Sequence, residues 1–308
     1  MEASYLVYII MDVVIAVACC LGNILVIWAV KMCNSMQQPT FCLIVSLAVA
    51  DFLVGALVVP FGFLVSGEVN SSFYGCLFMS CMCIVLTQAS VLSLLAIAID
   101  RFLRVLIPLK YKRIVTQSRS WAVVGICWLT AGIVGLTPMF GWNIHETSSN
   151  STSTNTQACV FLNVMSMSYM VYFNFFGCIL PPLLIITALY GYIFIAIHKQ
   201  LREGAVSGSE SVSYYRKERS LAGSLALVVV LYAFCWFPLH LMHVASFFWL
   251  VPVPSGAIDV GTLLSHTNSA VNPVVYAFKI EKLRAAYKII WRRFILCCVE
   301  KSNLKARA

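Results

Sequence analysis

Two histidines, His240 and His243, are spaced so that they could act together. Residues three apart lie on one face of a helix, and a pair of imidazoles there either binds a transition metal or forms hydrogen bonds. No cysteine or acid joins this pair at a ligand spacing, so we expect hydrogen bonding and no transition metal. The sequence also contains no nucleophile–base set, and an enzyme is not expected.

A second candidate is an acid near the outer end of the first apolar stretch, Asp12. A carboxylate at membrane depth costs roughly 2.5–3.5 kcal/mol on insertion scales, so it needs a partner. We expect that partner to be His266, which should lie at a similar depth and shares a helix face with Asp259 and Thr262. The alternative is that Asp12 extends to the membrane surface.

A third candidate is Asp51, which lies well inside the second apolar stretch. An unpaired carboxylate at this depth is either neutral or bound to a cation. Ser90, Asn268 and Asn272 should lie at a comparable depth on two other helices, so we expect a small hydrated cavity beside Asp51. The alternative is a buried acid with a structural role only.

The elements that hold these residues are membrane-spanning helices. The chain has 308 residues, is 61% hydrophobic and only 11% charged, and about 20 apolar residues in a helix cross a bilayer. We therefore expect an all-α membrane protein. It should form a seven-helix bundle with a short amphipathic eighth helix and with the third stretch at its centre. The seven stretches are Tyr5 to Val30, Thr40 to Val65, Ser72 to Leu106, Arg119 to Trp142, Ser166 to Ile197, Arg219 to Leu250 and Ser255 to Phe278.

The positions of the basic residues predict the orientation. All 21 Lys and Arg fall after the first stretch, after Phe278, or at and between the facing ends of the third and fourth and of the fifth and sixth stretches. The positive-inside bias makes these segments cytoplasmic and the N-terminus extracellular. The net charge of +9 then indicates anionic lipid and a cytoplasmic partner rather than nucleic acid.

Two of the 13 cysteines, Cys76 and Cys159, fall on the outer and oxidising side, and we expect a disulfide between them. It would hold Phe161 near the mouth of a cavity, where its ring could stack on a ligand. Asn70 and Asn150 each begin an Asn-X-Ser/Thr glycosylation signal on the same side.

Residues beyond the seventh stretch predict a membrane-surface segment. Glu281 to Arg293 has an amphipathic pattern, and Cys297 and Cys298 follow beside basic residues as candidate palmitoylation sites. We therefore assign residues 1–293 to a seven-transmembrane domain with its juxtamembrane helix, and residues 294–308 to a short cytoplasmic tail.

Several motifs together resemble the rhodopsin-like family of G-protein-coupled receptors. They are Gly22-Asn23, Leu47-Ala48-Val49-Ala50-Asp51, Cys76, Asp100-Arg101-Phe102, Trp128, Cys235-Trp236-Phe237-Pro238 and Asn272-Pro273-Val274-Val275-Tyr276. More narrowly, the chain resembles adenosine receptors, by Leu136 to Asn143, Tyr169 to Phe173 and Leu264-Ser265-His266. Arg104-Val105, Leu162 and the short third inner loop are similar to the subtypes that couple to the inhibitory G protein, which lowers cyclic AMP.

This resemblance implies a plasma-membrane receptor that binds adenosine and activates a heterotrimeric G protein. The purine would stack between Phe161 and Leu239 with Met170 at its edge, and the ribose would contact Thr87, Ser265 and His266, which Asp12 orients. The other implied ligand-binding residues are Gln88, Trp236, His240, His243, Ile258 and Thr262. A sodium ion would bind at Asp51, Ser90, Asn268 and Asn272, with no other cofactor, and Asp100, Arg101, Glu218 and Tyr276 would form the G-protein switch.

Two residues depart from the family pattern. Phe102 stands where the family usually has tyrosine, and His243 stands where adenosine receptors carry asparagine. An imidazole does not offer the side-by-side donor and acceptor of an amide, so the alternative is a receptor of the same fold with another purine as ligand, or with none known.

Proteins of other classes fit less well. A retinal protein needs a lysine within the seventh stretch, and the first lysine there is Lys279 at its inner end. An amine receptor needs an acid on the third helix, where Cys83 and Ile84 stand instead. A transporter is expected to show repeated halves, and the sequence has none.

Overall fold

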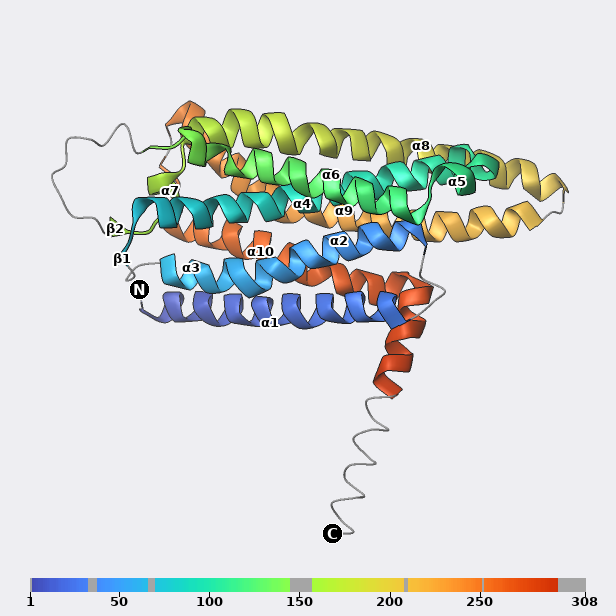
Figure 1. Cartoon of the computed structure of the whole chain (residues 1–308), viewed down its shortest axis with the longest axis horizontal. Coiled ribbons are helices and arrows are strands. Elements are labelled where there is room, and N and C mark those ends of the chain that lie inside the picture. The colour runs from blue at the N-terminus through green and yellow to red at the C-terminus, as the bar shows by residue number, and fades with distance from the viewer. Residues whose placement is uncertain are drawn as a thin grey trace, which may run out of the picture.

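A computed structural model describes residues 2–32, 38–65, 70–144, 157–207, 210–250 and 252–292. Long helices run up and down side by side and form a single bundle (Figure 1). The α-helices are α1 (Glu2–Met32), α2 (Pro39–Leu53), α3 (Val59–Val65), α4 (Phe73–Leu106), α5 (Pro108–Ile114), α6 (Gln117–Leu136), α7 (Phe161–Val164), α8 (Leu180–Ser207), α9 (Glu210–Trp249) and α10 (Ser255–Lys279).

Three further segments continue these helices with a different pitch. Two are π-helical, η2 (Val54–Val58) between α2 and α3, and η5 (Tyr169–Ile179) before α8. The third is a 3₁₀ turn, η3 (Thr137–Phe140), which ends α6. Prolines expected inside the spans lie at Pro238 in α9 and Pro273 in α10.

Seven helical rods correspond to the seven predicted stretches. Six of them are long and apolar enough to cross a membrane, and these are Leu6–Met32, Pro39–Gly62, Phe73–Leu106, Gln117–Phe140, Tyr169–Glu203 and Val212–Trp249. The seventh, α10, packs against α1 and α9, and five of its polar residues are buried: Ser265, His266, Asn268, Ser269 and Asn272. Its low hydropathy therefore arises from a polar face that points into the bundle.

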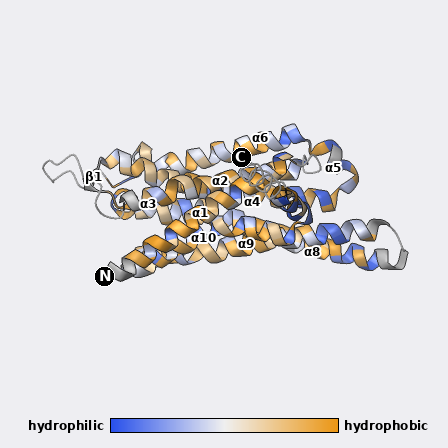
Figure 2. Cartoon of the chain, turned by 90° about the horizontal axis from the view of Figure 1, so that it is seen from below, coloured by the Kyte–Doolittle hydropathy of each residue, from blue (hydrophilic) through white to orange (hydrophobic). Residues whose placement is uncertain are grey.

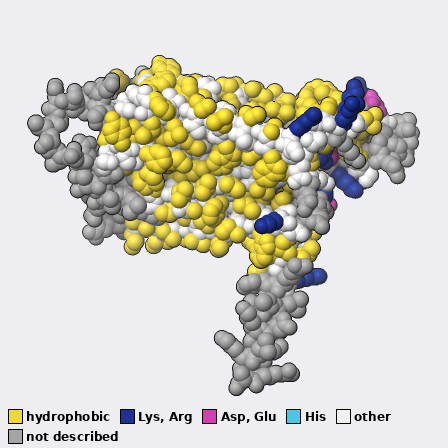
Figure 3. Space-filling model, viewed as in Figure 1, with side chains coloured by type: hydrophobic (Ala, Val, Ile, Leu, Met, Phe, Trp, Pro, Cys, Tyr) yellow, Lys and Arg dark blue, Asp and Glu magenta, His cyan; other side chains and the backbone are white. Residues whose placement is uncertain are grey.

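The surface of the bundle matches a membrane protein. Apolar side chains cover the middle of the face in Figure 3, and Lys and Arg gather at the end that holds α5. Figure 2 shows the same division, with hydrophilic residues at the ends of α5 and α8 beyond an apolar middle. Exposed Leu, Ile, Val and Phe side chains are typical of a surface that contacts lipid rather than water.

The central helix is α4, as the sequence predicted. It packs against α2, α6 and α8, and 72% of its most apolar window is buried, against 22% for the span that contains α6. The hydroxyl of Ser72 caps its first turn by accepting from the Gly75 amide at 3.2 Å. Gly135 lets α6 approach closely, because a Cβ there would lie 2.5 Å from Val85 Cγ2.

The predicted disulfide closes one end of the bundle. Cys76 at the start of α4 is bonded to Cys159, with 5.5 Å between their Cα atoms. Two short strands beside it, β1 (Asn70–Ser71) and β2 (Gln157–Ala158), pair antiparallel with Asn70 opposite Ala158. This end also holds α7 and the start of α1 (Figure 1).

The predicted amphipathic helix leaves the opposite end (Figure 1) and is helical over residues 281–292. Leu283, Ala286 and Ile290 are buried against the bundle. Trp291, near the end of this helix, is 65% exposed. The glycosylation signal at Asn150, the two cysteines Cys297 and Cys298, and the predicted tail lie outside the described residues.

Candidate functional site

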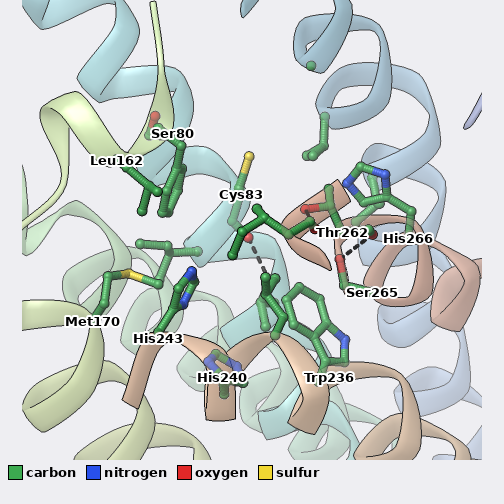
Figure 4. Close-up of a pocket in the computed structure, with 18 of the residues that line it drawn as sticks. Ser80, Cys83, Leu162, Met170, Trp236, His240, His243, Thr262, Ser265 and His266 are labelled. Atoms are coloured by element: carbon green, nitrogen blue, oxygen red, sulfur yellow. Dashed lines mark hydrogen bonds between the residues drawn. The ribbon is translucent and has the colours of Figure 1, made fainter. Parts of the chain in front are cut away.

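A cavity of about 290 Å³ lies in the half of the bundle that the disulfide closes (Figure 4). Its walls come from α1, η2, α3, α4, η5, α9 and α10 and from the segment after Cys159. Eleven of the twelve predicted ligand-binding residues line it: Thr87, Phe161, Met170, Trp236, Leu239, His240, His243, Ile258, Thr262, Ser265 and His266. Sequence reasoning did not assign Tyr8, Phe61, Ser80 or Asn174 to this lining.

Gln88, the twelfth predicted residue, does not line the cavity. Its side chain is buried and its Nε2 donates to Asn174 Oδ1 at 2.8 Å. Asn174 itself lines the cavity, so Gln88 supports the wall from behind. A buried amide satisfies its hydrogen bonds within the protein where it can, and the sequence contained no signal for this partner.

His266 and Asp12 form a buried pair at the cavity wall. Nδ1 of His266 lies 2.8 Å from Oδ1 of Asp12, and this contact joins α10 to α1. The carboxylate can only accept, so in the neutral imidazole the tautomer with the proton on Nδ1 is favoured. Nε2 is then left as a hydrogen-bond acceptor.

Three lining residues, two of them on α10 beside His266 and one on α4, donate their hydroxyls to carbonyls of their own helices. Thr87 donates to Cys83 O at 2.9 Å, Thr262 to Ile258 O at 2.9 Å, and Ser265 to Thr262 O at 2.7 Å. Each oxygen keeps free lone pairs. This side of the cavity therefore offers hydrogen-bond acceptors to a polar ligand.

The opposite wall is aromatic and carries the histidine pair. The ring of His240 stacks on Phe175 at 4.9 Å and on Trp236 at 5.8 Å between centroids. His240 and His243 are 3% and 6% exposed, and their ring centroids lie 6.4 Å apart. Neither nitrogen of His240, nor Nδ1 of His243, has a hydrogen-bond partner. Within the described ranges, no group of three or more His, Cys, Asp or Glu residues could hold a metal ion.

Asp51 lies deeper in the bundle, among polar groups from three helices. Nδ2 of Asn272 donates to Asp51 Oδ2 at 2.7 Å. Three neighbouring acceptors, Oδ1 of Asp51, Asn268 and Asn272, are buried without a partner, and Ser90 is buried as well. Hard oxygen ligands with one negative charge suit an alkali or alkaline-earth cation rather than a soft metal, so the residues present fit the implied sodium ion.

Asn23 adds to this polar layer from α1. Its Nδ2 donates to Cys19 O at 2.9 Å and to Ser269 O at 3.0 Å, which ties α1 to α10. Its Oδ1 is a further buried acceptor without a partner.

A charged network closes the other end of the bundle. Nε of Arg101 donates to Asp100 Oδ2 at 3.1 Å, and its Nη1 lies 3.3 Å from Glu218 Oε2. Arg101 also contacts the hydroxyl of Thr40, which donates to Asp100 at 2.6 Å. The pair predicted between α4 and α9 is therefore part of a larger set that includes α2. Tyr276, also predicted for the switch, is buried on α10, and its hydroxyl has no partner.

Two further residues of this network were not predicted. Nη1 of Arg104 lies 3.4 Å from Glu218 Oε1, so two arginines share one carboxylate. Its guanidinium also lies 4.7 Å from the ring centre of Tyr111 on α5, whose hydroxyl donates to Asp100 at 2.5 Å. Burial and the Asp100 charge raise the pKa of the Tyr111 phenol above its usual value, so Tyr111 stays a donor at neutral pH.

Comparison with known proteins agrees with this architecture. Residues 22–276 match the 7 transmembrane receptor (rhodopsin family), and the chain belongs to that family of G-protein-coupled receptors. It is 44% identical over 290 residues to adenosine receptor A3 of Canis lupus familiaris, across 94% of this chain and 92% of that one. It is also 44% identical over 295 residues to adenosine receptor A3 of Ovis aries and of Bos taurus, across 96% of this chain. Within the rhodopsin family, the chain is therefore a member of the adenosine receptors, which are multi-pass membrane receptors and not enzymes.

Proposed function

We propose that this chain is a cell-surface receptor for adenosine or a closely related purine nucleoside. One observation carries the proposal: eleven residues that the resemblance assigns to a nucleoside line one cavity of about 290 Å³. This volume is near the lower end of the roughly 300–1,000 Å³ of small-molecule sites, which suits a ligand as small as a nucleoside.

The polarity of the cavity supports a particular orientation of that ligand. The purine stacks between Phe161 and Leu239, with Met170 at its edge and Trp236 beneath it. The ribose hydroxyls donate to the acceptors gathered around His266, whose Nδ1 is held 2.8 Å from Asp12. The acceptor-rich wall thus binds the sugar, and the aromatic wall binds the base.

The receptor signals by changing the population of two conformations. In the closed one, Glu218 on α9 holds Arg101 and Arg104 at 3.3 and 3.4 Å. The nucleoside favours the conformation in which the inner end of α9 moves outward and admits a G protein. It acts only through its differential affinity for the two states. Sodium at Asp51, Ser90, Asn268 and Asn272 favours the closed state.

The orientation and the partners follow from the charges. The end that holds α5 and the helix at residues 281–292 carries Lys and Arg (Figure 3), so we assign it to the cytoplasm and the N-terminus to the exterior of the plasma membrane. The receptor domain spans residues 1–293, and residues 294–308 form a cytoplasmic tail. The G protein is of the inhibitory type, which lowers cyclic AMP.

His243 supports a second candidate, a receptor of the same fold for another purine. It lines the cavity and lacks the paired donor and acceptor of the asparagine found there in adenosine receptors. The two candidates share the fold, the switch and the sodium site, and differ only in the ligand.

The test is adenosine-stimulated nucleotide exchange on purified inhibitory G protein, with the full chain in lipid vesicles, beside a His243→Asn variant. We expect adenosine to accelerate exchange in both receptors. Acceleration in the variant alone would assign the natural chain to the second candidate. Acceleration in neither would contradict the proposed function.

A further inference from the structure

The hydrogen-bonding state of His243 bears on which nucleoside the cavity accepts. The side chain is 6% exposed and points into the cavity beside Met170 and above His240 (Figure 4). Its Nδ1 is enclosed by protein and has no partner. The ring lines the cavity, so Nε2 is the nitrogen that a ligand meets.

The enclosed nitrogen determines the tautomer of this ring. A neutral imidazole carries one proton, and the nitrogen that holds it is a donor while the other is an acceptor. Buried N–H groups without a partner are rarer in proteins than buried acceptors without one. The proton therefore belongs on Nε2, and His243 presents a single N–H donor to the ligand.

Among the described residues that line the cavity, no carboxylate lies beside His243 to complement an amino group on the ligand. Met170 beside it is apolar (Figure 4), and so is Leu239, one turn earlier on α9. Both nitrogens of His240 are buried, and its ring stacks on Phe175 and on Trp236. One lone pair of Asn174 Oδ1 already accepts from Gln88. Among the described residues that line the cavity there is no Asp or Glu.

We propose that the cavity prefers 6-oxopurine nucleosides to 6-aminopurine nucleosides, an inference that rests on the proposed function. In a 6-oxopurine, O6 and N7 are adjacent acceptors, and the one N–H of His243 serves either or both. In a 6-aminopurine, N7 alone can accept from His243, and the amino group beside N7 is a donor that faces the same N–H. An unpaired polar group in a desolvated site lowers affinity.

The experiment compares inosine with adenosine, which differ only in the group at C6 and the proton at N1. Nucleotide exchange on purified G protein is measured with the full receptor in lipid vesicles, over a range of each nucleoside. We expect the concentration of inosine for half-maximal exchange to be about tenfold lower than that of adenosine, which is what one lost hydrogen bond of ordinary strength produces.

Two variants at the same position separate the effect of the N–H donor from the effect of the side-chain volume. His243→Asn restores a paired donor and acceptor, so the preference should reverse in favour of adenosine. His243→Ala removes the donor, so inosine should lose potency and the two nucleosides should become equivalent. Thermal unfolding in detergent checks that each variant is folded, and the natural chain alone already gives the decisive comparison.

The outcomes separate this inference from the proposed function. Inosine ahead of adenosine in the natural chain, with reversal in His243→Asn, supports both. Adenosine equal to or ahead of inosine overturns the preference and leaves the nucleoside receptor intact. Exchange that responds to neither nucleoside overturns the proposed function, and the preference with it.

Discussion

Nδ1 of His266 and Oδ1 of Asp12 lie 2.8 Å apart, and this contact joins α10 to α1 at the wall of the cavity. It fixes the proton of His266 on Nδ1 and leaves Nε2 as an acceptor. His243, across the cavity, has its enclosed Nδ1 unpaired and presents a donor. The two histidines therefore offer opposite groups to a ligand, and the proposed orientation places the sugar beside His266 and the base beside His243.

Replacing Asp12 by asparagine should weaken nucleoside binding without unfolding the receptor. The amide no longer holds His266 in one tautomer, and loss of such an orienting partner typically costs about 10–100-fold. We expect at least a tenfold rise in the nucleoside concentration for half-maximal exchange. The potency of a 2′-deoxynucleoside should fall less, because it lacks one of the hydroxyls that would donate a hydrogen bond to His266.

Asp259→Asn is the matched control, because Asp259 lies on the same helix as His266 and is exposed. It should leave the nucleoside potency unchanged. Equal potencies for the two variants would show that Asp12 does not act through His266.

Replacing Glu218 by glutamine should raise the basal activity of the receptor. Glu218 is buried and shared by Arg101 and Arg104 at 3.3 and 3.4 Å, so loss of its charge destabilises the closed state. A shift of about 1.4 kcal/mol changes a two-state ratio tenfold, and we expect a basal exchange rate about three- to tenfold higher. The control is Glu203→Gln, whose exposed pair with Lys199 at 3.9 Å contributes little. A basal rate that rises equally in both variants would argue against the switch.

Asp51 should be required for an effect of sodium. The buried acceptors around it fit a monovalent cation, and a cation that binds only the closed state lowers agonist affinity by mass action. We expect sodium chloride to reduce nucleoside affinity several-fold relative to potassium chloride at equal ionic strength, and Asp51→Asn to abolish the difference. A variant that keeps the full sodium effect would place the cation elsewhere.

Gly135 should be essential for packing between α4 and α6. A Cβ there would lie 2.5 Å from a Val85 side-chain carbon and 2.7 Å from its backbone nitrogen, which cannot yield by rotation. Overpacking of this kind costs about 1–3 kcal/mol, so Gly135→Ala should lower the temperature of unfolding by several degrees. Gly132 lies one turn earlier with nothing within 4 Å of its Cβ position. Gly132→Ala should therefore be neutral or slightly stabilising, and equal losses in both variants would contradict the close contact.

The main architecture was predictable from the sequence, because hydropathy and charge report directly on the membrane. The spans, the central position of α4 and the Cys76–Cys159 disulfide agree with the structure. The seventh span, α10, is the instructive case, since its buried polar face hides it from a hydropathy measure. It was recognisable from its length and from the Asn272-Pro273 motif.

The finer composition of the site was not predictable in the same way. Gln88 follows Thr87 directly, yet only Thr87 lines the cavity, because the rotation of a helix about its axis decides which neighbour faces inward. The π-helical turns at Val54–Val58 and Tyr169–Ile179 alter that rotation locally. Asn174 lies in the second of them and lines the cavity, where it accepts from Gln88. The roles of Arg104 and Tyr111 depend on contacts between α4, α5 and α9, and no local sequence pattern predicts these contacts.

Photoaffinity labelling with an azido-substituted purine nucleoside, followed by mass spectrometry of the purified receptor, tests most directly whether the cavity lined by Phe161 and His243 binds the ligand. We predict that the label appears on peptides that contain Phe161 or residues 239–243, and that excess unlabelled inosine or adenosine prevents it. Labelling confined to other segments, or labelling that neither nucleoside displaces, would contradict a nucleoside site in this cavity.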